Sequence, residues 1–260
     1  MNFLIIVSNQ DIASTTFKQV IFSKYKLEKI KEDLFLLDKE GINKIYVKVI
    51  DYLHITSNEK QILEDSLDIN QIIFLTRHST LGELKPKSMT VHACGNWGKA
   101  DLGGIENTVT ITDPILIRYL LVELRRNKPL SIKPYEVKQE ATHHGPDLSI
   151  STIFYEIGSS EDDWKNLEVA EYMLNILFNS IVNYNREDIK KEKNWIEAVG
   201  VGGSHYCTKF NKKTFDEKQP YCFGHVVASY ALDDIKAKPE LLEQAKEKSS
   251  ASVVVNEEEL

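Results

Sequence analysis

The sequence predicts a mixed α/β fold with a mostly parallel central sheet, and three observations carry this prediction. Short apolar runs with β-branched residues recur, amphipathic helical segments separate several of them, and a 260-residue chain that is 42% hydrophobic can bury a substantial core. Alternating strands and helices favour a parallel sheet flanked by helices. Because no internal repeat and no linker rich in Pro, Gly or Ser divides the chain, we expect a single domain over residues 1–260. Its tail, from about residue 239, is expected to be peripheral or to cross back onto the sheet.

The first half of the chain is predicted as a strand, a helix and then further strands. Residues 2–8 are an apolar run, and Ser14, Thr15 and Thr16 are candidate caps for the helix that follows. Further strands are expected at residues 34–39, 45–51, 72–78 and 89–95, with a weak helix before the third of them.

The second half has stronger boundary signals. Asp113 followed by Pro114 predicts a helix start, because the aspartate accepts hydrogen bonds from free amides and proline fits the first helical position. Ser160 with Asp163 caps the longest predicted helix, which runs to about residue 184. Strands are expected at residues 135–144, 151–159 and 195–201, the last of them central in the sheet.

Composition argues against several classes of protein. The formal net charge of −7 and a pI near 5.6 argue against a protein that coats DNA or RNA, so any RNA contact must be local. No apolar run reaches the roughly 18 residues of a membrane span, and the amino terminus lacks signal-peptide features, so we expect a cytoplasmic protein. Cys94, Cys207 and Cys222 are odd in number and lack CxxC spacing, which indicates neither a disulfide framework nor a thiolate zinc site.

Histidines recur at one kind of position in the predicted fold. Of the seven in the sequence, five lie at or just past the carboxyl end of a predicted strand: His78, His92, His143, His144 and His205. In open parallel sheets, ligands bind outside the carboxyl ends of the strands, where loops from distant parts of the sequence meet. A single histidine beside a strand is more often structural, but five at one edge predict a functional site.

Glycine-rich turns accompany these histidines. Gly145 follows the histidine pair, Gly202 and Gly203 precede His205, and glycines surround Trp97. Glycine leaves room for a ligand against the main chain and exposes amides that can donate to an oxyanion or a phosphate. Ordinary turn formation explains any one of these glycines equally well. Their association with the histidines is what predicts a cleft.

Six sequence blocks together resemble the archaeal and plant D-aminoacyl-tRNA deacylase family. They are TRHS (76–79), VHACGNWGKADLGG (91–104), EATHHGP (140–146), FYEIGSSEDDW (154–164), VGVGGSHY (199–206) and FGH (223–225). The resemblance covers most of the chain, with the blocks in the family's order, although the first 70 or so residues contribute only their strand pattern. The sequence departs from the family pattern at Cys94, at Cys207 and Thr208 where Ala-Pro is expected, and in HVVASY, which lacks an expected proline.

The resemblance implies both a fold and an activity. The implied fold is a three-layer α/β/α sandwich akin to nucleoside phosphorylases and peptidyl-tRNA hydrolases. The implied protein is a monomer with about two zinc ions per subunit, which releases a free D-amino acid and tRNA by hydrolysing the ester of D-aminoacyl-tRNA.

The chemistry of the histidines agrees with that activity. Histidine and carboxylate are the usual ligands of a catalytic zinc ion, which lowers the pKa of water to about 7 and polarises an ester carbonyl. No tight HxH or HExxH motif is present, so ligation is inferred from position and from the family. Neighbouring side chains alternate in direction on an extended segment, so we expect His143 and His144 to serve different ions. The candidate ligands are His78, His92, His143, His144, Glu156 and His205, with His225 in reserve.

The predicted catalytic set is His143, His144, Glu156 and His205. A metal-free mechanism stays open, in which one of these histidines acts as a general base on water and Glu140 or Glu156 orients it. A serine nucleophile at Ser79, Ser159 or Ser204 is disfavoured, because no GxSxG elbow is present.

Substrate contacts are assigned to residues beside these segments. Trp97 is a candidate platform for the terminal adenine of tRNA or for a substrate side chain, although packing explains it equally well. Gly145, Gly202 and Gly203 are assigned to the substrate cleft. Lysines near the site are candidates for phosphate contacts at the acceptor end of tRNA: Lys85, Lys87, Lys99, Lys209, Lys212 and Lys213.

Two other functions stay open at this point. The same histidines and glutamate suit a zinc peptidase or amidohydrolase that acts on small molecules, but such an enzyme leaves the nearby lysines unused. A non-catalytic RNA or nucleotide-binding module could use the histidines only to build a pocket. Turnover with zinc supplied separates the second function from the others.

Overall fold

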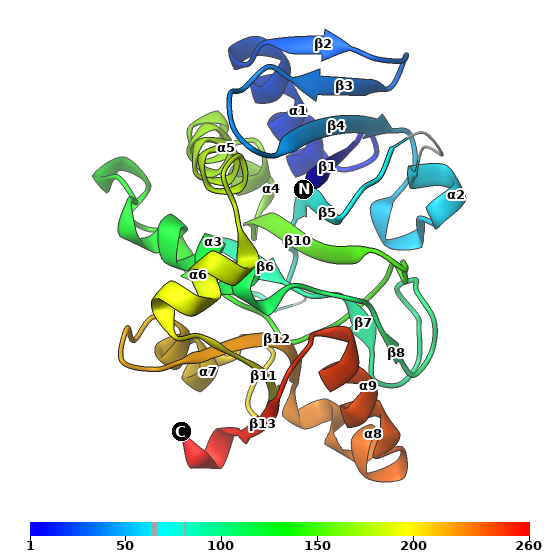
Figure 1. Cartoon of the computed structure of the whole chain (residues 1–260), viewed down its shortest axis with the longest axis vertical. Helices are drawn as coiled ribbons and strands as arrows, with labels where there is room; N and C mark the ends of the chain where they lie inside the picture. Colours follow the sequence, from blue (N-terminus) through cyan, green and yellow to red (C-terminus); the bar gives the residue numbers. More distant parts are fainter. Residues whose placement is uncertain (64–66, 81) are drawn as a thin grey trace.

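The predicted mixed α/β class with a mostly parallel central sheet is confirmed. The computed structural model describes residues 1–63, 67–80 and 82–260 (Figure 1). Within these residues the main sheet has eight strands in the order β2-β3-β4-β1-β5-β10-β6-β9. The strands are β1 (Asn2–Ser8), β2 (Leu27–Lys29), β3 (Leu34–Leu37), β4 (Lys44–Ile50), β5 (Gln71–Arg77), β6 (Ser88–His92), β9 (Glu136–Lys138) and β10 (Ser151–Gly158).

Strand direction changes across the main sheet. β1 pairs in parallel with β4 and β5, and β5 pairs in parallel with β10. By contrast, β6 runs antiparallel to β10 and parallel to β9. The carboxyl ends of β6 and β9 therefore point away from those of β5 and β10. The prediction that one carboxyl edge gathers the five histidines is wrong, since His78 follows β5 whereas His92 ends β6.

Alternating side chains give the main sheet two buried faces. On one face Phe3 and Ile5 belong to a large core cluster that includes residues of α1 (Ile12–Lys24), α3 (Pro114–Arg126) and α5 (Leu167–Ile181). On the other face Leu4 and Ile6 belong to a second cluster, which includes Ile62 of α2 (Glu59–Ile62), and Ile55 of η1 (His54–Thr56) packs against it. Helical segments thus cover both faces of the sheet (Figure 1).

A second sheet occupies the carboxyl-terminal part of the chain. Its order is β12-β11-β13, with β11 (Ile196–Val201) parallel to both β12 (Tyr221–Val227) and β13 (Val253–Asn256). The prediction that residues 195–201 form a strand of the central sheet is wrong, because both edges of β11 pair within this smaller sheet. The tail forms α9 (Glu240–Lys248) and β13, so it crosses back onto the second sheet. Helix α3 contacts β6 and β12 and so joins the two sheets.

Local capping signals set several helix boundaries. Asp113 caps α3, as predicted. Ser160 and Asp163 form the predicted capping box, but they start only the short α4 (Glu161–Trp164), and α5 has its own cap at Asn166. The prediction of one long helix over this segment is therefore wrong. The cap of α1 is Asp11 rather than the hydroxyl residues that follow it.

The other elements are short. They are β7 (Gly95–Asn96), β8 (Thr108–Val109), η2 (Leu130–Ile132), α6 (Arg186–Lys193), α7 (Thr208–Thr214), η3 (Ser229–Ala231), α8 (Leu232–Ala237) and η4 (Glu257–Glu259). Of the predicted strand over residues 135–144, only β9 is regular. In the described ranges, no helix combines the length and the apolar character needed to cross a membrane.

Candidate metal centre

Glu156 anchors the site on the main sheet. It lies on β10, where its register partners are Thr76 on β5 and Thr90 on β6. The hydroxyl of Thr76 donates to Oε1 of Glu156 at 2.7 Å, and the hydroxyl of Thr90 donates to Oε2 at 3.2 Å. These bonds fix a buried carboxylate on β10 between β5 and β6, close to the carboxyl ends of β5 and β10.

The loop after β9 brings further site residues from the side of the second sheet. The amide of Ala141 donates to the carbonyl of His205 at 2.8 Å, and the amide of Thr142 donates to the carbonyl of Val226 at 3.0 Å. A β-bridge joins His143 to Cys94, next to the end of β6. The loop is therefore tied to both sheets, and it places Glu140, His143 and His144 near Glu156.

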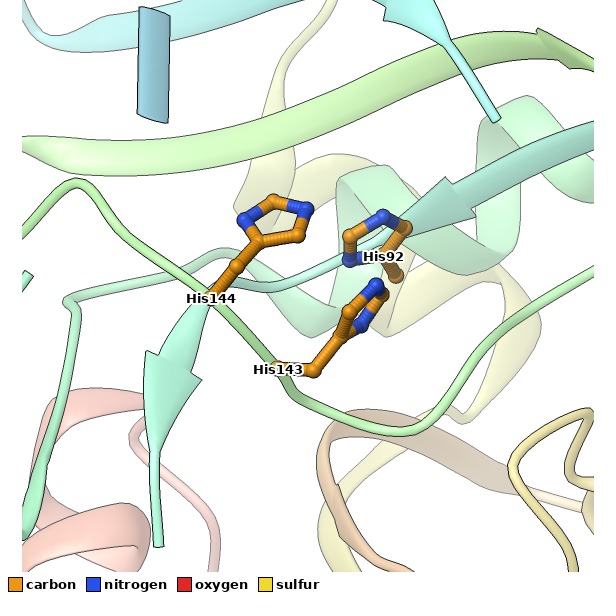
Figure 2. A group of neighbouring side chains, drawn as sticks. All are labelled: His92, His143 and His144. Atoms are coloured by element: carbon orange, nitrogen blue, oxygen red, sulfur yellow. The ribbon is translucent and has the colours of Figure 1, made fainter. Parts of the chain in front are cut away.

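Three imidazoles converge within this loop and β6. Figure 2 shows the rings of His92, His143 and His144 facing one another from two chain segments. The ring centroids lie 4.6 Å apart for His92 and His143, 5.3 Å for His92 and His144, and 4.3 Å for His143 and His144. Such close packing of three basic rings is unfavourable for protonated imidazoles but suits three ligands around one cation.

Backbone carbonyls fix the tautomer of all three rings. Nδ1 lies 2.9 Å from the carbonyl oxygen of Ala93 in His92, 2.8 Å from that of Ala141 in His143, and 2.6 Å from that of Gly145 in His144. A carbonyl oxygen only accepts, so each Nδ1 carries the proton and each neutral ring keeps its lone pair on Nε2. This is the arrangement that orients metal-bound histidines.

The two adjacent histidines belong to the same group. Their expected opposite directions require an extended backbone, but His144 has φ 49°, in the left-handed region. The left-handed residue turns the chain so that both rings come to the same side. The prediction that His143 and His144 serve different ions therefore loses its premise.

Glu140 links the remaining histidines. Its Oε1 lies 2.9 Å from Nδ1 of His78, and its Oε2 lies 3.2 Å from Nε2 of His205. The other nitrogen of each ring faces a tyrosine hydroxyl, at 3.3 Å for His78 with Tyr206 and at 3.1 Å for His205 with Tyr230. A chain of polar contacts thus runs from Tyr206 through Glu140 to Tyr230.

Burial and neighbouring charges set the protonation of the cluster. Burial, reinforced by His92, lowers the pKa of His143 to about 3. Burial and His143 likewise hold the pKa of His144 well below its usual range. Burial opposes protonation of His92 too, but its contact with Glu156 outweighs burial and raises its pKa to about 9. Two of the three rings are therefore neutral, and a proton and a cation compete for the third.

The two carboxylates stay ionised beside these rings. Burial alone would raise the pKa of Glu140, but hydrogen bonds from His205 and His78 hold it well below its usual range. For Glu156 burial is likewise outweighed by His92, so its pKa is also lowered. Two buried anions beside the neutral rings of His143 and His144 favour a bound cation.

The donor set fits zinc. In the described part of the chain, three overlapping groups offer donor atoms within 4.8 Å of one another: His92, His143 and His144; Glu140, His143 and His205; and His78, Glu140 and Glu156. Nitrogen and carboxylate oxygen donors of this kind are the usual zinc ligands. Nε2 of His92 is buried, and its polar neighbour is Oε2 of Glu156 at 3.5 Å, which is too long for a good hydrogen bond. The shared residues make the three groups one continuous site.

Other predicted residues lie outside this cluster. His225 is buried with Nδ1 at 3.1 Å from the Thr142 hydroxyl and Nε2 donating to the carbonyl of Thr110 at 3.0 Å, so both its nitrogens face protein groups. A β-carbon on Gly145 would lie 2.2 Å from the amide nitrogen of Gly104, so this glycine permits close packing of two loops. Gly202 and Gly203, at φ 109° and 79°, pack against Glu257.

The predicted phosphate-binding lysines differ in whether their charge is paired with a carboxylate. Nζ of Lys87 donates to Asp163 at 2.8 Å and lies 5.1 Å from the ring centroid of Tyr135. Lys85 donates to the carbonyl of Thr80, and Lys209 lies 3.4 Å from the carbonyl of Glu257. A carbonyl contact leaves the charge of a lysine unpaired, whereas the ion pair of Lys87 neutralises it.

Sequence reasoning gave Glu140 only a secondary part and missed Tyr206 and Tyr230. Glu140 stands three residues before His143, which is the only local signal for it. Tyr206 follows His205 directly, so the sequence places it near a predicted site residue. Its contact with His78, which lies 128 residues away, could not be predicted. Tyr230 has no sequence signal. It lies on η3, which follows β12 in the sequence, and only the fold brings it to His205.

Comparison with known proteins shows the family of this chain. Residues 65–259 match the family model described as D-aminoacyl-tRNA deacylase. The chain is 33% identical to the D-aminoacyl-tRNA deacylase of Picrophilus torridus, over 90% of this chain and 81% of the relative. It is 32% identical to the protein of that name from Archaeoglobus fulgidus, over 98% and 87%. A crystal structure of a conserved protein of unknown function superposes with a TM-score of 0.82 at 29% identity, covering 98% of this chain and 86% of that one. The chain therefore belongs to the D-aminoacyl-tRNA deacylase family.

Proposed function

We propose that this chain hydrolyses the ester bond of D-aminoacyl-tRNA with a zinc ion held by His92, His143 and His144. The observation that carries the proposal is that backbone carbonyls hold the Nδ1 protons of all three rings, which leaves three Nε2 lone pairs for one cation. The names of the relatives supply the substrate. When bound, zinc supplies Lewis acidity, because it polarises an ester carbonyl and makes water more acidic.

The residues around these ligands have separate tasks in the proposal. Glu140 is ionised, and it orients His78 and His205 through contacts of 2.9 and 3.2 Å. With Nε2 of His205 on this carboxylate, Nδ1 is the nitrogen that can take a proton from water, at the position that the Tyr230 hydroxyl faces at 3.1 Å. Glu156 and Glu140 also offer oxygen ligands for a second ion with His78.

The histidine and glutamate dyad also favours a second mechanism for the same reaction. His205 paired with Glu140 at 3.2 Å is the arrangement of a general base and its orienting carboxylate, and it needs no metal ion. Removal of metal separates the two mechanisms, because only the first loses its Lewis acid.

Chelation is expected to abolish deacylation of D-tyrosyl-tRNA, and added zinc is expected to restore it. The three imidazoles then lose the cation that makes them a catalytic unit. The measurement compares the deacylation rates of D-tyrosyl-tRNA and L-tyrosyl-tRNA with and without chelator, with metal content measured by elemental analysis. Full activity in a metal-free preparation would support the His205 mechanism instead. Equal rates on free D-tyrosine ester and on charged tRNA would favour a small-molecule hydrolase.

Salt should weaken tRNA binding only modestly. The net charge of −7 disfavours long-range attraction, so we expect about three or four phosphate contacts and a slope of log affinity against log salt of about −2 to −4. Alanine at Lys85, Lys99, Lys209, Lys212 or Lys213 should raise KM, and each removal of a lysine that binds a phosphate should reduce the slope by about one. Alanine at Lys87 should change KM less, because this lysine pairs with Asp163 at 2.8 Å. A slope near zero in the wild type contradicts the proposed phosphate contacts.

A further inference from the structure

A cavity adjoins the candidate metal centre. Its volume is about 250 Å³, and His143 and His144 form part of its wall. The remaining wall includes Trp97, Lys99, Asp101, Tyr230 and Asp234. Drug-sized ligands occupy pockets of roughly 300–1,000 Å³, so this cavity suits a group smaller than a nucleotide. A group inside it would lie directly against two of the three converging imidazoles.

The cavity wall carries two carboxylates, Asp101 and Asp234, and one ammonium group, that of Lys99. Asp101 and Asp234 make no ion pair in the part of the chain that the structure describes, whereas the neighbouring Asp233 pairs with Lys236 at 3.0 Å. The carboxylate of Asp234 lies over Gly98, where a β-carbon would be 3.0 Å from it. Glycine at this position therefore lets the acidic group lie against the backbone beside the cavity.

One residue of the cavity wall also carries a buried donor without a partner. Trp97 is 4% exposed, and its indole N–H has no hydrogen-bond acceptor in the described residues. A buried N–H without a partner is costly, so an acceptor on a bound group would stabilise the complex. The wall thus holds two carboxylates without an ion pair, the single ammonium group of Lys99 and the tryptophan with the unpaired donor. Because the carboxylates outnumber the lysine, the wall suits a small group that carries a cation.

We propose that this cavity binds the aminoacyl group of the substrate and that Asp234, with Asp101 beside it, binds the α-ammonium group. The proposal rests on the proposed deacylase function. The α-ammonium is the cation at the 3′ end of an aminoacyl-tRNA, and the carboxylates repel the phosphates of the RNA. An ammonium held here and an ester carbonyl facing His143 and His144 fix two of the bonds at the α-carbon. The direction of the side chain then follows from the handedness of the amino acid.

Matched aspartate variants test the proposal. Asp234→Asn should lower kcat/KM for D-tyrosyl-tRNA by about 10- to 100-fold, the usual effect of losing a charge-assisted hydrogen bond. Asp233→Asn is the control, because Asp233 lies in the same first turn of α8, is 95% exposed at its side chain and does not line the cavity. It should leave kcat/KM unchanged. Gly98→Ala should reproduce the loss without a charge change, because its methyl group would displace the carboxylate of Asp234.

A blocked substrate identifies the group that is recognised. Wild-type protein should hydrolyse N-acetyl-D-tyrosyl-tRNA much more slowly than D-tyrosyl-tRNA, and Asp234→Asn should not slow the acetylated substrate further. Equal wild-type rates on the two substrates, or an Asp234→Asn variant that behaves like Asp233→Asn, would overturn the ammonium assignment while the deacylase function stands. Wild-type protein that fails to hydrolyse D-tyrosyl-tRNA with zinc supplied would overturn the deacylase function itself, and the assignment with it.

Discussion

Alanine at His92, His143 or His144 is expected to lower kcat/KM for D-tyrosyl-tRNA by about 100- to 1,000-fold. Each substitution removes one of three Nε2 donors whose tautomers are fixed by the carbonyls of Ala93, Ala141 and Gly145. Loss of the ion removes the group that stabilises charge on the ester oxygen, and a single such stabilising group is commonly worth about 100- to 1,000-fold. Deacylation rate and zinc content are measured on the same samples, and both should fall.

His225 supplies the matched control. It is also a buried histidine, but both of its nitrogens face protein groups, and its pKa is lowered to about 3 by burial. His225→Gln should therefore lower thermal stability while the zinc content per folded molecule stays unchanged. Loss of zinc in His225→Gln, or retention of zinc in all three alanine variants, would show that the ion binds elsewhere.

The parts of the fold that were predictable are those fixed by neighbouring residues. Asp113 with Pro114 sets the start of α3 through bonds within one turn, and the capping box of Ser160 and Asp163 is equally local. The assignment of residues 195–201 to the main sheet was wrong, because β11 has the apolar pattern of any buried strand. Its partners, β12 and β13, follow it in the sequence, and only pairing over long distances decides which sheet it joins.

The site was predicted in its residue types but not in its geometry. The histidines do converge with Glu156, yet they do so on a sheet face, because β6 runs antiparallel to β10. The left-handed backbone of His144 could not be inferred, since such a conformation is uncommon outside glycine. The position of Glu140 between two histidines could not be inferred either. Its contacts with His78 and His205 join residues that lie 62 and 65 positions apart (140 − 78 and 205 − 140).

Replacing Glu140 with glutamine is expected to reduce kcat by about 100- to 1,000-fold with a small change in KM. The carboxylate faces Nδ1 of His78 through Oε1 at 2.9 Å and accepts from Nε2 of His205 through Oε2 at 3.2 Å. Glutamine has one acceptor and one donor in the same volume, so its NH₂ group must face one of the two imidazoles, and that ring must change tautomer or move. Glu136→Gln is the control, since Glu136 lies on β9 with its side chain 73% exposed and pairs only with Lys138 among the described ion pairs.

Zinc content then decides what Glu140 does. Glu140 belongs to two of the three donor groups but not to the group of His92, His143 and His144. If it is a ligand of a second ion, Glu140→Gln should lose that ion and keep the one held by the three imidazoles, so the zinc content should fall by about half. If it only orients His205, the zinc content should stay the same, and the loss should appear in kcat and in its dependence on pH. Wild-type kcat in Glu140→Gln would contradict both roles, because neither survives an amide that cannot accept from both rings.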